Sequence, residues 1–395
     1  MTQNGDADGI IVEAVGEEPL DEHGDSSRFL LSLAGYQEPL SLVGKRTNAV
    51  EAVFYQYFAP SFPHFTVKCY FTHVGLDEGW LVLGDVYNDH APETWTAKDI
   101  EIIIGSLASL HASYWAKREL LDQYGLPGLL QGCSIQDGDE AERKSERAGT
   151  EQPPRPMDRI EQWLQSQHRL LTEHALRTAG PTLAPLLLEA SKGLETLRNY
   201  GGWPGIVDER HMVALADLLD DPMPLLYPLR QQPCTLLHGE PSSENWYLTL
   251  FDEYYLLDWQ KMTVGPGIYD LVRFIDQFAM LPGNLSANEA LQADTAVETM
   301  IDSYVLAMRS ELGSRFDARS TRLAVPAARC LLVLIYWIPK LGSWLKEMSF
   351  ENEAWRAMNE IPDDALVDVG IVDLAAWRNS LALVFDRFMR DYRRL

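Results

Sequence analysis

Basic residues are scarce in this chain. Its 33 Lys and Arg residues stand against 58 Asp and Glu residues, which gives a formal net charge of −25 at pH 7. Nucleic acids and anionic membranes bind basic protein surfaces, so this balance argues against either as the main partner. We interpret the excess acid as a solubility feature; an attraction for cationic ligands is the alternative.

Cysteine is equally scarce. The four residues, Cys69, Cys133, Cys234 and Cys330, are widely scattered along the sequence. None forms a close pair spaced as zinc ligands, and together they do not form the dense framework of a secreted disulfide scaffold. We therefore expect reduced cysteines that serve in packing.

Long apolar runs and targeting signals are also missing. Residues 1–8 are polar and lack the basic and then apolar stretch of a secretory signal. The apolar stretch 330–338, bounded by Arg329 and Pro339, is far too short to span a bilayer. With 46% apolar residues in 395, these observations predict a soluble cytoplasmic protein with two packed lobes or domains and no membrane partner.

The apolar pattern changes near residue 90. Residues 10–86 show short apolar runs broken by turn residues, together with one helix-like segment, which is typical of a small sheet plus a helix. From residue 97 onward the pattern is mainly helical. We therefore expect an α+β fold with a small N-terminal sheet lobe, residues 1–88, and a larger, mainly helical C-terminal lobe, residues 89–395.

Within the helical part, residues 99–117 carry apolar side chains at helical spacing, and His111 falls on the same face. A packed core histidine is therefore expected there, rather than a ligand. Residues 136–155 are rich in charge, glycine and proline without periodicity, which predicts a surface loop that is either a lid over a substrate site or an inert insertion. Further amphipathic helices are expected around residues 157–179, 185–200, 285–312, 324–345 and 375–395.

The most informative stretch of the sequence lies near residue 240. A short apolar run, residues 234–237, predicts a buried strand that leads into a loop containing His238 and Glu240. Two further strands are expected at residues 246–250 and 254–258, joined by a tight turn. This arrangement places several polar side chains around one hairpin.

The expected hairpin register brings three oxygen-bearing side chains together. With the turn centred near Asp252, Trp246 is expected opposite Asp258, and Asn245 beside it, roughly 5 Å across the ladder. Glu240, Asn245 and Asp258 would then converge. Carboxylate and amide oxygens suit Mg²⁺, and phosphoryl transfer needs a metal to neutralise phosphates and a carboxylate within reach of the attacking hydroxyl.

The order of these residues is similar to that of a known family. His-Gly-acid, Asn five residues further, then Leu-Asp-Trp-Gln at 257–260 and Gly-Pro-Gly-Ile-Tyr-Asp-Leu at 265–271 resemble the aminoglycoside phosphotransferase and choline kinase-like superfamily, especially its ecdysteroid-kinase-like branch. The family has a two-lobed protein-kinase-like fold. Matching stretches follow in the same order at residues 41–45, 51–55, 80–85 and 107–115, and the likeness spans roughly residues 10 to 280.

The resemblance implies roles for individual residues and names the cofactors, ATP and Mg²⁺. Lys45 would bind the nucleotide phosphates and Glu51 would be its partner on the following helix. Asn245 and Asp258 would hold the metal. Asp270 would be a buried structural acid near the catalytic loop.

Two residues of the loop have predicted catalytic roles. Glu240 would orient or deprotonate the acceptor hydroxyl. For His238, a direct chemical role and a scaffold role, in which it hydrogen-bonds the turn, are both open. Asn245 and Asp258 have their own alternative, because Asn and Asp often cap the turns at hairpin ends.

Three features depart from the family pattern. Glu240 replaces an aspartate, which moves the carboxylate by roughly 1 Å, a displacement that costs about a hundredfold in rate when a catalytic group is misplaced. The segment corresponding to the nucleotide-covering loop, residues 16–28, holds five carboxylates and a proline. Lys45 and Glu51 are only six residues apart, a spacing that argues against an ion pair between them.

Two functions follow from these observations. The first is an ATP-dependent O-phosphotransferase acting on a hydroxyl of a small organic molecule. The second is a protein of kinase fold that has lost phosphoryl transfer and binds or transforms a small-molecule ligand in specialised metabolism.

Overall fold

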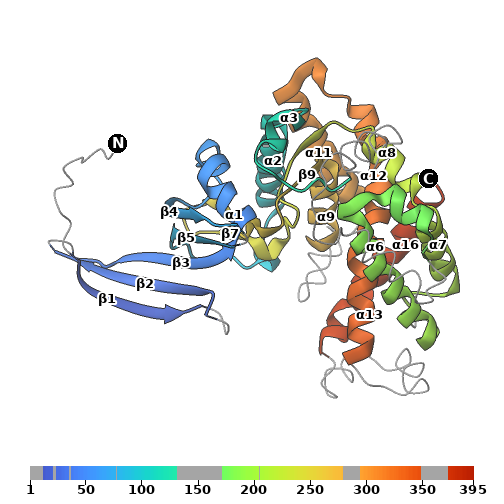
Figure 1. Cartoon of the computed structure of the whole chain (residues 1–395), viewed down its shortest axis with the longest axis horizontal. Coiled ribbons are helices and arrows are strands. Elements are labelled where there is room, and N and C mark those ends of the chain that lie inside the picture. The colour runs from blue at the N-terminus through green and yellow to red at the C-terminus, as the bar shows by residue number, and fades with distance from the viewer. Residues whose placement is uncertain are drawn as a thin grey trace, which may run out of the picture. The chain divides into compact units, whose positions relative to one another are not determined.

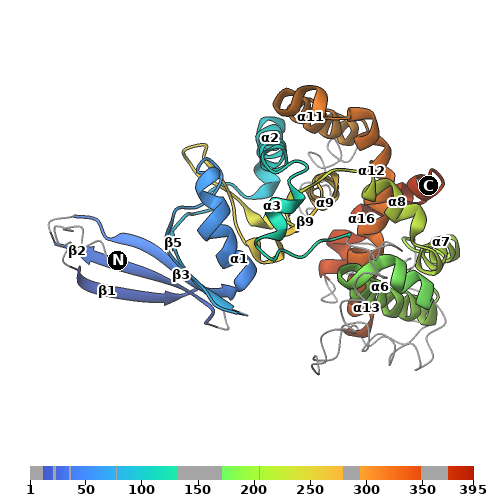
Figure 2. The ribbon, with the colours of Figure 1, turned by 45° about the horizontal axis from the view of Figure 1, so that its top comes forward.

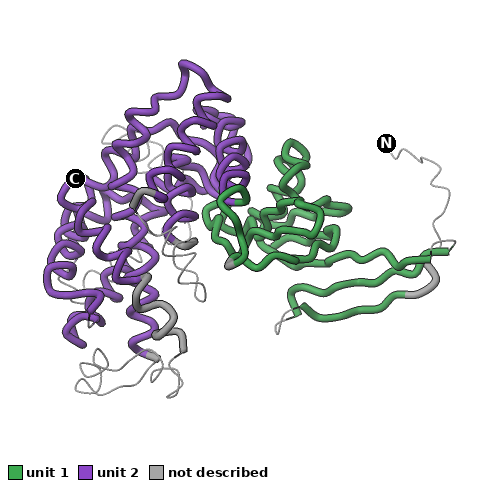
Figure 3. The backbone as a smooth tube through the Cα atoms, turned by 180° about the vertical axis from the view of Figure 1, so that it is seen from behind, with its two compact units in different colours: residues 1–99, 238–262 green, residues 100–237, 263–395 purple. Residues whose placement is uncertain are grey.

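The computed structural model describes residues 12–130, 171–278, 294–347 and 372–395, apart from residues 21–23, 35–36, 77 and 204. The chain divides into two compact units (Figure 3). Unit 1 consists of residues 1–99 and 238–262, and unit 2 of residues 100–237 and 263–395. The lobe boundary between residues 88 and 89 stays a prediction, and the loop predicted at residues 136–155 lies outside the described residues.

Unit 1 is built on a five-stranded antiparallel sheet (Figure 1). Its strands are β1 (Val12–Pro19), β2 (Ser26–Leu33), β3 (Leu40–Asn48), β4 (Cys69–Val74) and β5 (Glu78–Gly84). The spatial order is β1-β2-β3-β5-β4, so β3 is the central strand. Residues 42–45 of β3 pair with both β2 and β5, so Lys45 lies in a stretch of the strand that is held on both sides.

A short helix packs directly on this sheet. The helix α1 (Ala49–Val53) continues as a π-helical turn, Phe54–Phe58, and contacts β3, β4 and β5. A Cβ at Gly79 on β5 would lie 2.5 Å from the Cβ of Ala52. Glycine at position 79 is therefore required for α1 to pack this closely on the sheet.

The hairpin of unit 1 has a different register from the predicted one. Its strands, β7 (Trp246–Leu248) and β8 (Tyr254–Leu256), have three residues each, and Trp246 pairs with Leu256 instead of Asp258. The predicted register was wrong by two residues. The turn closes through Thr249, whose N–H donates to the Glu253 carbonyl at 3.0 Å, so the turn centre lies one residue earlier than expected.

Unit 2 is mainly helical (Figure 2). A two-stranded antiparallel sheet, β6 (Cys234–Leu237) and β9 (Thr263–Pro266), flanks in sequence the segment 238–262 that belongs to unit 1. The helix α12 packs against α8, α9 and α16. The described helices are α2 (Ala97–Ser113), α3 (Arg118–Asp122), α6 (Glu173–Tyr200), α7 (Glu209–Asp220), α8 (Met223–Arg230), α9 (Ile268–Phe278), α11 (Asp294–Leu312), α12 (Ala318–Leu332), α13 (Ile338–Glu347) and α16 (Val372–Tyr392).

The predicted α+β class, with a small sheet lobe and a larger helical lobe, is confirmed. The helices expected around residues 185–200, 324–345 and 375–395 are present, although α6 is broken at Gly180, where φ is 80°. His111 is completely buried, and its Nδ1 lies 2.8 Å from the hydroxyl of Tyr304, which confirms a packed histidine. Asp270 is also fully buried.

The apolar stretch at residues 330–338 lies within a longer helical segment. The helices α12 and α13 are joined by a π-helical turn, so a continuous helical segment of 29 residues, Ala318–Lys346, is long and apolar enough to cross a membrane. Its most apolar window is 78% buried within the protein. Length therefore does not exclude a membrane span, whereas burial of this kind is typical of a core helix.

Two helices of unit 2 meet through glycine. A Cβ at Gly193 on α6 would lie 2.4 Å from the backbone oxygen of Ile338 at the start of α13. A Cβ at Gly342 on α13 would lie 2.6 Å from the Cα of Gly193. The two backbones therefore touch with no room for a methyl group, so the contact cannot adjust by moving a side chain.

We predict that Gly193→Ala lowers the free energy of unfolding by about 2 kcal/mol, because the added methyl group overpacks a backbone contact. The matched control is Gly105→Ala in α2, where a Cβ would meet no atom within 4 Å. That change is expected to raise stability by about 0.5–1 kcal/mol, since alanine favours a helix interior over glycine. Urea unfolding of both variants measures the difference; equal effects would contradict the close packing.

Candidate functional site

Unit 1 contains a cavity of about 460 Å³. One part of its wall is apolar and includes Val43 on β3 and Leu83 on β5. The other part is polar and contains the four residues predicted to bind the cofactor: Lys45, Glu51, Asn245 and Asp258. Its volume falls within the range of small-molecule pockets, about 300–1,000 Å³.

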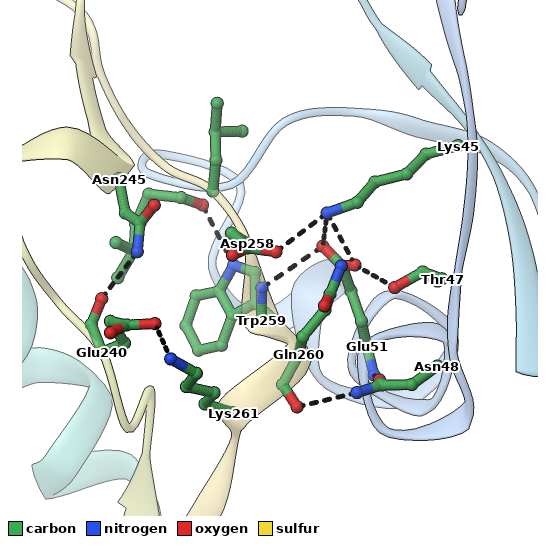
Figure 4. A network of polar contacts seen from close by, with 12 residues as sticks. Lys45, Thr47, Asn48, Glu51, Glu240, Asn245, Asp258, Trp259, Gln260 and Lys261 are labelled. Atoms are coloured by element: carbon green, nitrogen blue, oxygen red, sulfur yellow. Dashed lines mark hydrogen bonds and ion pairs between the residues drawn. The ribbon is translucent and has the colours of Figure 1, made fainter. Parts of the chain in front are cut away.

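The carboxylate of Glu51 is the centre of the polar wall (Figure 4). Its side chain is only 1% exposed. It accepts hydrogen bonds from the ammonium of Lys45 at 3.1 Å, from the backbone N–H of Trp259 at 3.2 Å, and from the hydroxyl of Thr47. A buried carboxylate is costly unless it is paired and hydrogen-bonded, and these three donors meet that requirement.

The ion pair between Lys45 and Glu51 contradicts the expectation drawn from their short spacing. The Lys45 Nζ lies 2.9 Å from Glu51 Oε2. Asn48, the last residue of β3, caps α1 by accepting a hydrogen bond from the Glu51 N–H at 3.0 Å. Because strand and helix share this residue, no longer connection is needed, and the first helical turn returns Glu51 to Lys45.

Asn48 also ties the helix to the segment after the hairpin. Its Nδ2 donates to the backbone carbonyl of Gln260 at 2.9 Å. One residue earlier, the ring of Trp259 stacks on Phe54 with centroids 3.5 Å apart and an interplanar angle of 9°. Both rings are completely buried. Strand β3, helix α1 and residues 258–260 are thus fixed to one another.

Asp258 is the second partner of Lys45. Its Oδ1 lies 2.9 Å from the Lys45 Nζ. Its backbone adopts the left-handed conformation, with φ 61° and ψ 65°, a region that Asp and Asn tolerate better than most residues. Burial lowers the pKa of Lys45, but the carboxylates of Glu51 and Asp258 outweigh burial, so the net pKa of Lys45 is raised.

Asn245 is held by backbone contacts on two sides. Its backbone carbonyl accepts a hydrogen bond from the Leu257 N–H at 2.9 Å, which places Asn245 beside the segment that carries Asp258. Its Nδ2 donates to the backbone carbonyl of Glu240 at 2.8 Å. The bond to Glu240 therefore determines the orientation of the side-chain amide. The Oδ1 of Asn245 takes no part in that bond.

The oxygens of Asn245 and Asp258 suit a Mg²⁺ ion whose remaining coordination positions are filled by phosphates. Among the described residues, no group of three or more His, Cys, Asp or Glu side chains could hold a metal ion. Mg²⁺ commonly takes one or two protein oxygens and fills its remaining positions with phosphates and water. An amide oxygen and a carboxylate in one cavity wall match that requirement, whereas the described residues of this wall include no His or Cys, the side chains typical of zinc sites.

Glu240 does not converge with Asn245 and Asp258 as predicted. Its carboxylate Oε2 lies 2.5 Å from the Nζ of Lys261, and the side chain is 18% exposed. It is not among the residues lining the cavity. Only Asn245 and Asp258 of the three predicted oxygen donors share the cavity wall, because the Glu240 side chain turns to Lys261.

His238 is completely buried and holds the loop together. Its Nε2 donates to the Leu257 carbonyl at 2.9 Å, and its Nδ1 accepts from the Glu240 N–H at 3.2 Å. With both ring nitrogens occupied by backbone groups, the geometry favours the scaffold alternative. Gly239 has φ 85°, and a Cβ there would lie 2.0 Å from the Lys261 carbonyl oxygen, so the turn requires glycine.

The acidic segment around residue 20 forms part of the β1–β2 hairpin. Glu18 pairs with Arg28 at 2.9 Å, and Arg28 also donates to Asp85 at 2.7 Å. Asp85 accepts a further hydrogen bond from the hydroxyl of Ser41 at 2.6 Å. The described carboxylates of this segment, at positions 17, 18 and 25, do not line the cavity.

Several residues of the site were not predicted from the sequence. Thr47 and Asn48 complete the Glu51 network, and Asn immediately before a helix is a recognised capping signal that could have identified Asn48. Lys261, the partner of Glu240, follows directly after the Leu-Asp-Trp-Gln motif but has no pattern of its own. The Arg28–Asp85 pair joins residues 57 positions apart, and no local signal indicates it.

Comparison with known proteins agrees with the predicted resemblance. The model of the phosphotransferase enzyme family matches residues 116–303. This stretch contains the motif from His238 to Gln260. The predicted aminoglycoside phosphotransferase and choline kinase-like superfamily is thereby confirmed over this part of the chain, while the ecdysteroid-kinase-like branch stays a prediction. No curated protein matches the sequence.

Two solved structures of low identity illustrate the similarity. An aminoglycoside phosphotransferase from Alicyclobacillus acidocaldarius is 10% identical, with 97% of this chain and 93% of that chain covered and a TM-score of 0.44. A choline/ethanolamine kinase family protein from Mesorhizobium loti is 16% identical, with coverages of 96% and 92% and a TM-score of 0.38. Identities this low say nothing about the acceptor.

We predict that Glu51→Gln lowers the free energy of unfolding by about 3 kcal/mol, the range for removing one charge of a buried pair. The charge of Lys45 would then be balanced by Asp258 alone. Glu78→Gln is the matched control, because Glu78 pairs with Arg46 at the surface, where both side chains are more than half exposed. Urea unfolding should show almost no loss for this control; an equal loss would contradict the central role of Glu51.

The raised pKa of Lys45 predicts a pH dependence of stability. A lysine whose folded pKa lies above its ordinary value of 10.5 stabilises the protein fully below that value. This contribution is lost as pH rises through the raised folded pKa. The difference in unfolding free energy between the natural protein and Lys45→Met should therefore be constant from pH 7 to pH 10 and shrink above it. A difference that grows with pH would contradict the assignment.

Proposed function

We propose that the protein is an ATP-dependent phosphotransferase that transfers a phosphoryl group to a hydroxyl of a small organic molecule. One observation carries the proposal: Lys45 on the central strand is paired with Glu51 on α1 and with Asp258, in the wall of a single cavity. In protein kinases, a strand lysine paired with a helix glutamate, and a metal-binding aspartate, must both be in place for transfer. The family match over residues 116–303 supports the same reaction class.

The cavity offers complementary surfaces to a nucleotide. Its apolar wall, with Val43 and Leu83, suits the faces of a base, and its polar wall suits the phosphates. Lys45 would donate to phosphate oxygens, and Glu51 would keep its ammonium in position. The central strand and the fixed helix make this geometry available before the nucleotide binds, which lowers the cost of ordering it.

Asn245 and Asp258 would hold Mg²⁺, which supplies charge neutralisation for the phosphates. In the free protein Asp258 and Lys45 are paired at 2.9 Å. On binding, the Lys45 ammonium would turn from Asp258 to the phosphates, and the Asp258 carboxylate would turn to the cation. Each of the two side chains would then face a group of opposite charge.

Glu240 would act on the acceptor hydroxyl, orienting it and accepting its proton. Its ion pair with Lys261 has to open for this role. Lys261 is 58% exposed, so its side chain can leave at little cost. His238 would act through Glu240 as a positioning residue, because it accepts the Glu240 N–H.

A second candidate function is ligand binding, or different chemistry, in the same cavity without phosphoryl transfer. The observation that favours it is the ion pair between Glu240 and Lys261, which occupies the proposed base. This alternative predicts a thermal shift with an organic ligand and none with ATP and Mg²⁺. Detectable transfer from ATP to any acceptor removes it.

We predict Mg²⁺-dependent ATP binding, measured by calorimetry on the full chain. Lys45→Met should raise the Kd for ATP at least tenfold. Asp258→Asn should make ATP binding less dependent on Mg²⁺. This variant should keep the left-handed backbone conformation, which Asn also tolerates. Arg46→Ala is the matched control: it removes a neighbouring charge from β3 that does not line the cavity and should leave the Kd within twofold. Absence of binding at millimolar ATP would contradict the proposal.

Substitution of Glu240 separates binding from transfer. Glu240→Gln should leave the Kd for ATP unchanged, because the side chain does not line the cavity, and should lower transfer at least a hundredfold. Glu240→Asp restores the family residue and should retain or raise transfer. Transfer of labelled phosphate from ATP to a panel of aminoglycosides, amino alcohols, sugars and sterols provides the assay. Full transfer by Glu240→Gln would exclude this residue as the base.

A further inference from the structure

The five-stranded sheet of unit 1 has two edge strands, β1 and β4 (Figure 1). An edge strand offers unpaired backbone N–H and C=O groups to any other strand, and proteins commonly protect such edges with charged side chains, proline or bulges. The two edges of this sheet differ in that protection. The difference indicates which edge can accept a further strand.

The strand β1 carries all three forms of protection. Its sequence, VEAVGEEP, holds three glutamates and ends in Pro19. Its pairing with β2 is irregular between Val12 and Ala14. Proline cannot donate to a neighbouring strand, and like charges that face each other across a ladder are destabilising. The β1 edge is therefore unsuited to pairing with another copy of this acidic chain.

The strand β4 has little protection. Its sequence, CYFTHV, contains no Asp, Glu, Lys, Arg or Pro. Its pairing with β5 is irregular between Cys69 and Phe71, and residues 71–74 pair regularly. In the part of the chain that the structure describes, no strand pairs with β4 on the side away from β5. Neither charge nor proline therefore opposes the addition of a strand at this edge.

Exposed aromatic side chains accompany this edge. Phe71 is 55% exposed and Tyr70 is 49% exposed. Phe71 pairs with Val82 and His73 pairs with Trp80, so Trp80, which is 48% exposed, lies diagonally beside Phe71 on the same face of the sheet. Aromatic side chains are enriched at protein interfaces, where each buries a large apolar area. The open edge thus continues into an apolar surface that a second strand and its sheet would cover.

The charges at the two ends of β4 indicate the kind of partner. Lys68, which is exposed, directly precedes the strand, and the first charged residues after it in the sequence are Asp77 and Glu78. A strand with a basic start and an acidic end matches its own copy when the two run antiparallel, because each end then lies beside the opposite charge. Glu78 is paired with Arg46 at the surface, where an ion pair opens at little cost.

We propose that β4 is a self-association edge, at which two copies of this chain pair antiparallel about a two-fold axis. Both copies use the same strand, so the contact closes on itself as a dimer. The axis stands perpendicular to the sheet, and five strands from each copy form one continuous sheet. Centred near the middle of β4, at Phe71 or Thr72, the pairing places the two Phe71 side chains opposite or diagonal to each other on one face.

Sedimentation velocity of the full chain over a range of concentrations tests the proposal. We expect a reversible dimer with twice the chain mass of 44.6 kDa. Phe71→Lys and Phe71→Glu should each weaken dimerisation at least tenfold, because each places like charges beside each other across the axis. An equimolar mixture of the two variants should associate again, since opposite charges then meet at the same position.

The matched control is Val15→Lys on the β1 edge of the same sheet. Val15 is 61% exposed, and its substitution should leave dimerisation within twofold of the natural protein. The proposal is overturned if the natural chain stays monomeric up to about 100 µM, which would leave the edge to a strand of another protein. It is also overturned if Val15→Lys weakens dimerisation as much as Phe71→Lys, or if the mixture associates no more tightly than either Phe71 variant alone.

Discussion

The buried carboxylate of Glu51 is the constraint on which the candidate site depends. A carboxylate that is 1% exposed is stable only with nearby donors, because its loss of water has to be offset by ion pairing and hydrogen bonds. Those donors come from Lys45 and Thr47 on β3 and from the Trp259 backbone. Strand, helix and the segment after the hairpin are therefore held in one arrangement.

This arrangement also explains how the polar wall is prepared before a ligand arrives. In the free protein the Lys45 ammonium is paired with the carboxylates of Glu51 and Asp258. Lys45 and Asp258 are nevertheless each placed for an opposite charge, phosphate for the lysine and a cation for the aspartate. Side chains fixed by their neighbours bind with less loss of freedom, which favours binding of a nucleotide together with its metal.

Much of the fold was predictable because its signals are local. The strand at residues 234–237 and the helices with clear apolar periodicity are present as expected. The hairpin register was not predictable to the residue, since it depends on how Thr249 closes the turn. The apolar run at residues 330–338 alone was judged too short to span a bilayer, but it lies within a continuous helical segment, Ala318–Lys346, in which a π-helical turn joins α12 and α13.

Prediction of the site succeeded where the motif is local and failed where the contacts join residues that are distant in the sequence. Lys45, Glu51, Asn245 and Asp258 line one cavity, as the family resemblance implied. The doubt about the Lys45–Glu51 pair came from counting residues, and it failed because Asn48 ends the strand and caps the helix at once. Glu240 was expected beside the metal ligands, but Lys261, which no sequence pattern connected to it, takes its carboxylate.

A crystal structure of the protein with Mg²⁺ and a non-hydrolysable ATP analogue tests the central claim most directly. The account predicts the phosphates on the Nζ of Lys45, the cation on the oxygens of Asn245 and Asp258, and the Lys45–Glu51 pair intact. A nucleotide bound elsewhere, or a cavity in which Lys45 keeps both carboxylates while the analogue is absent at saturating concentration, would contradict it.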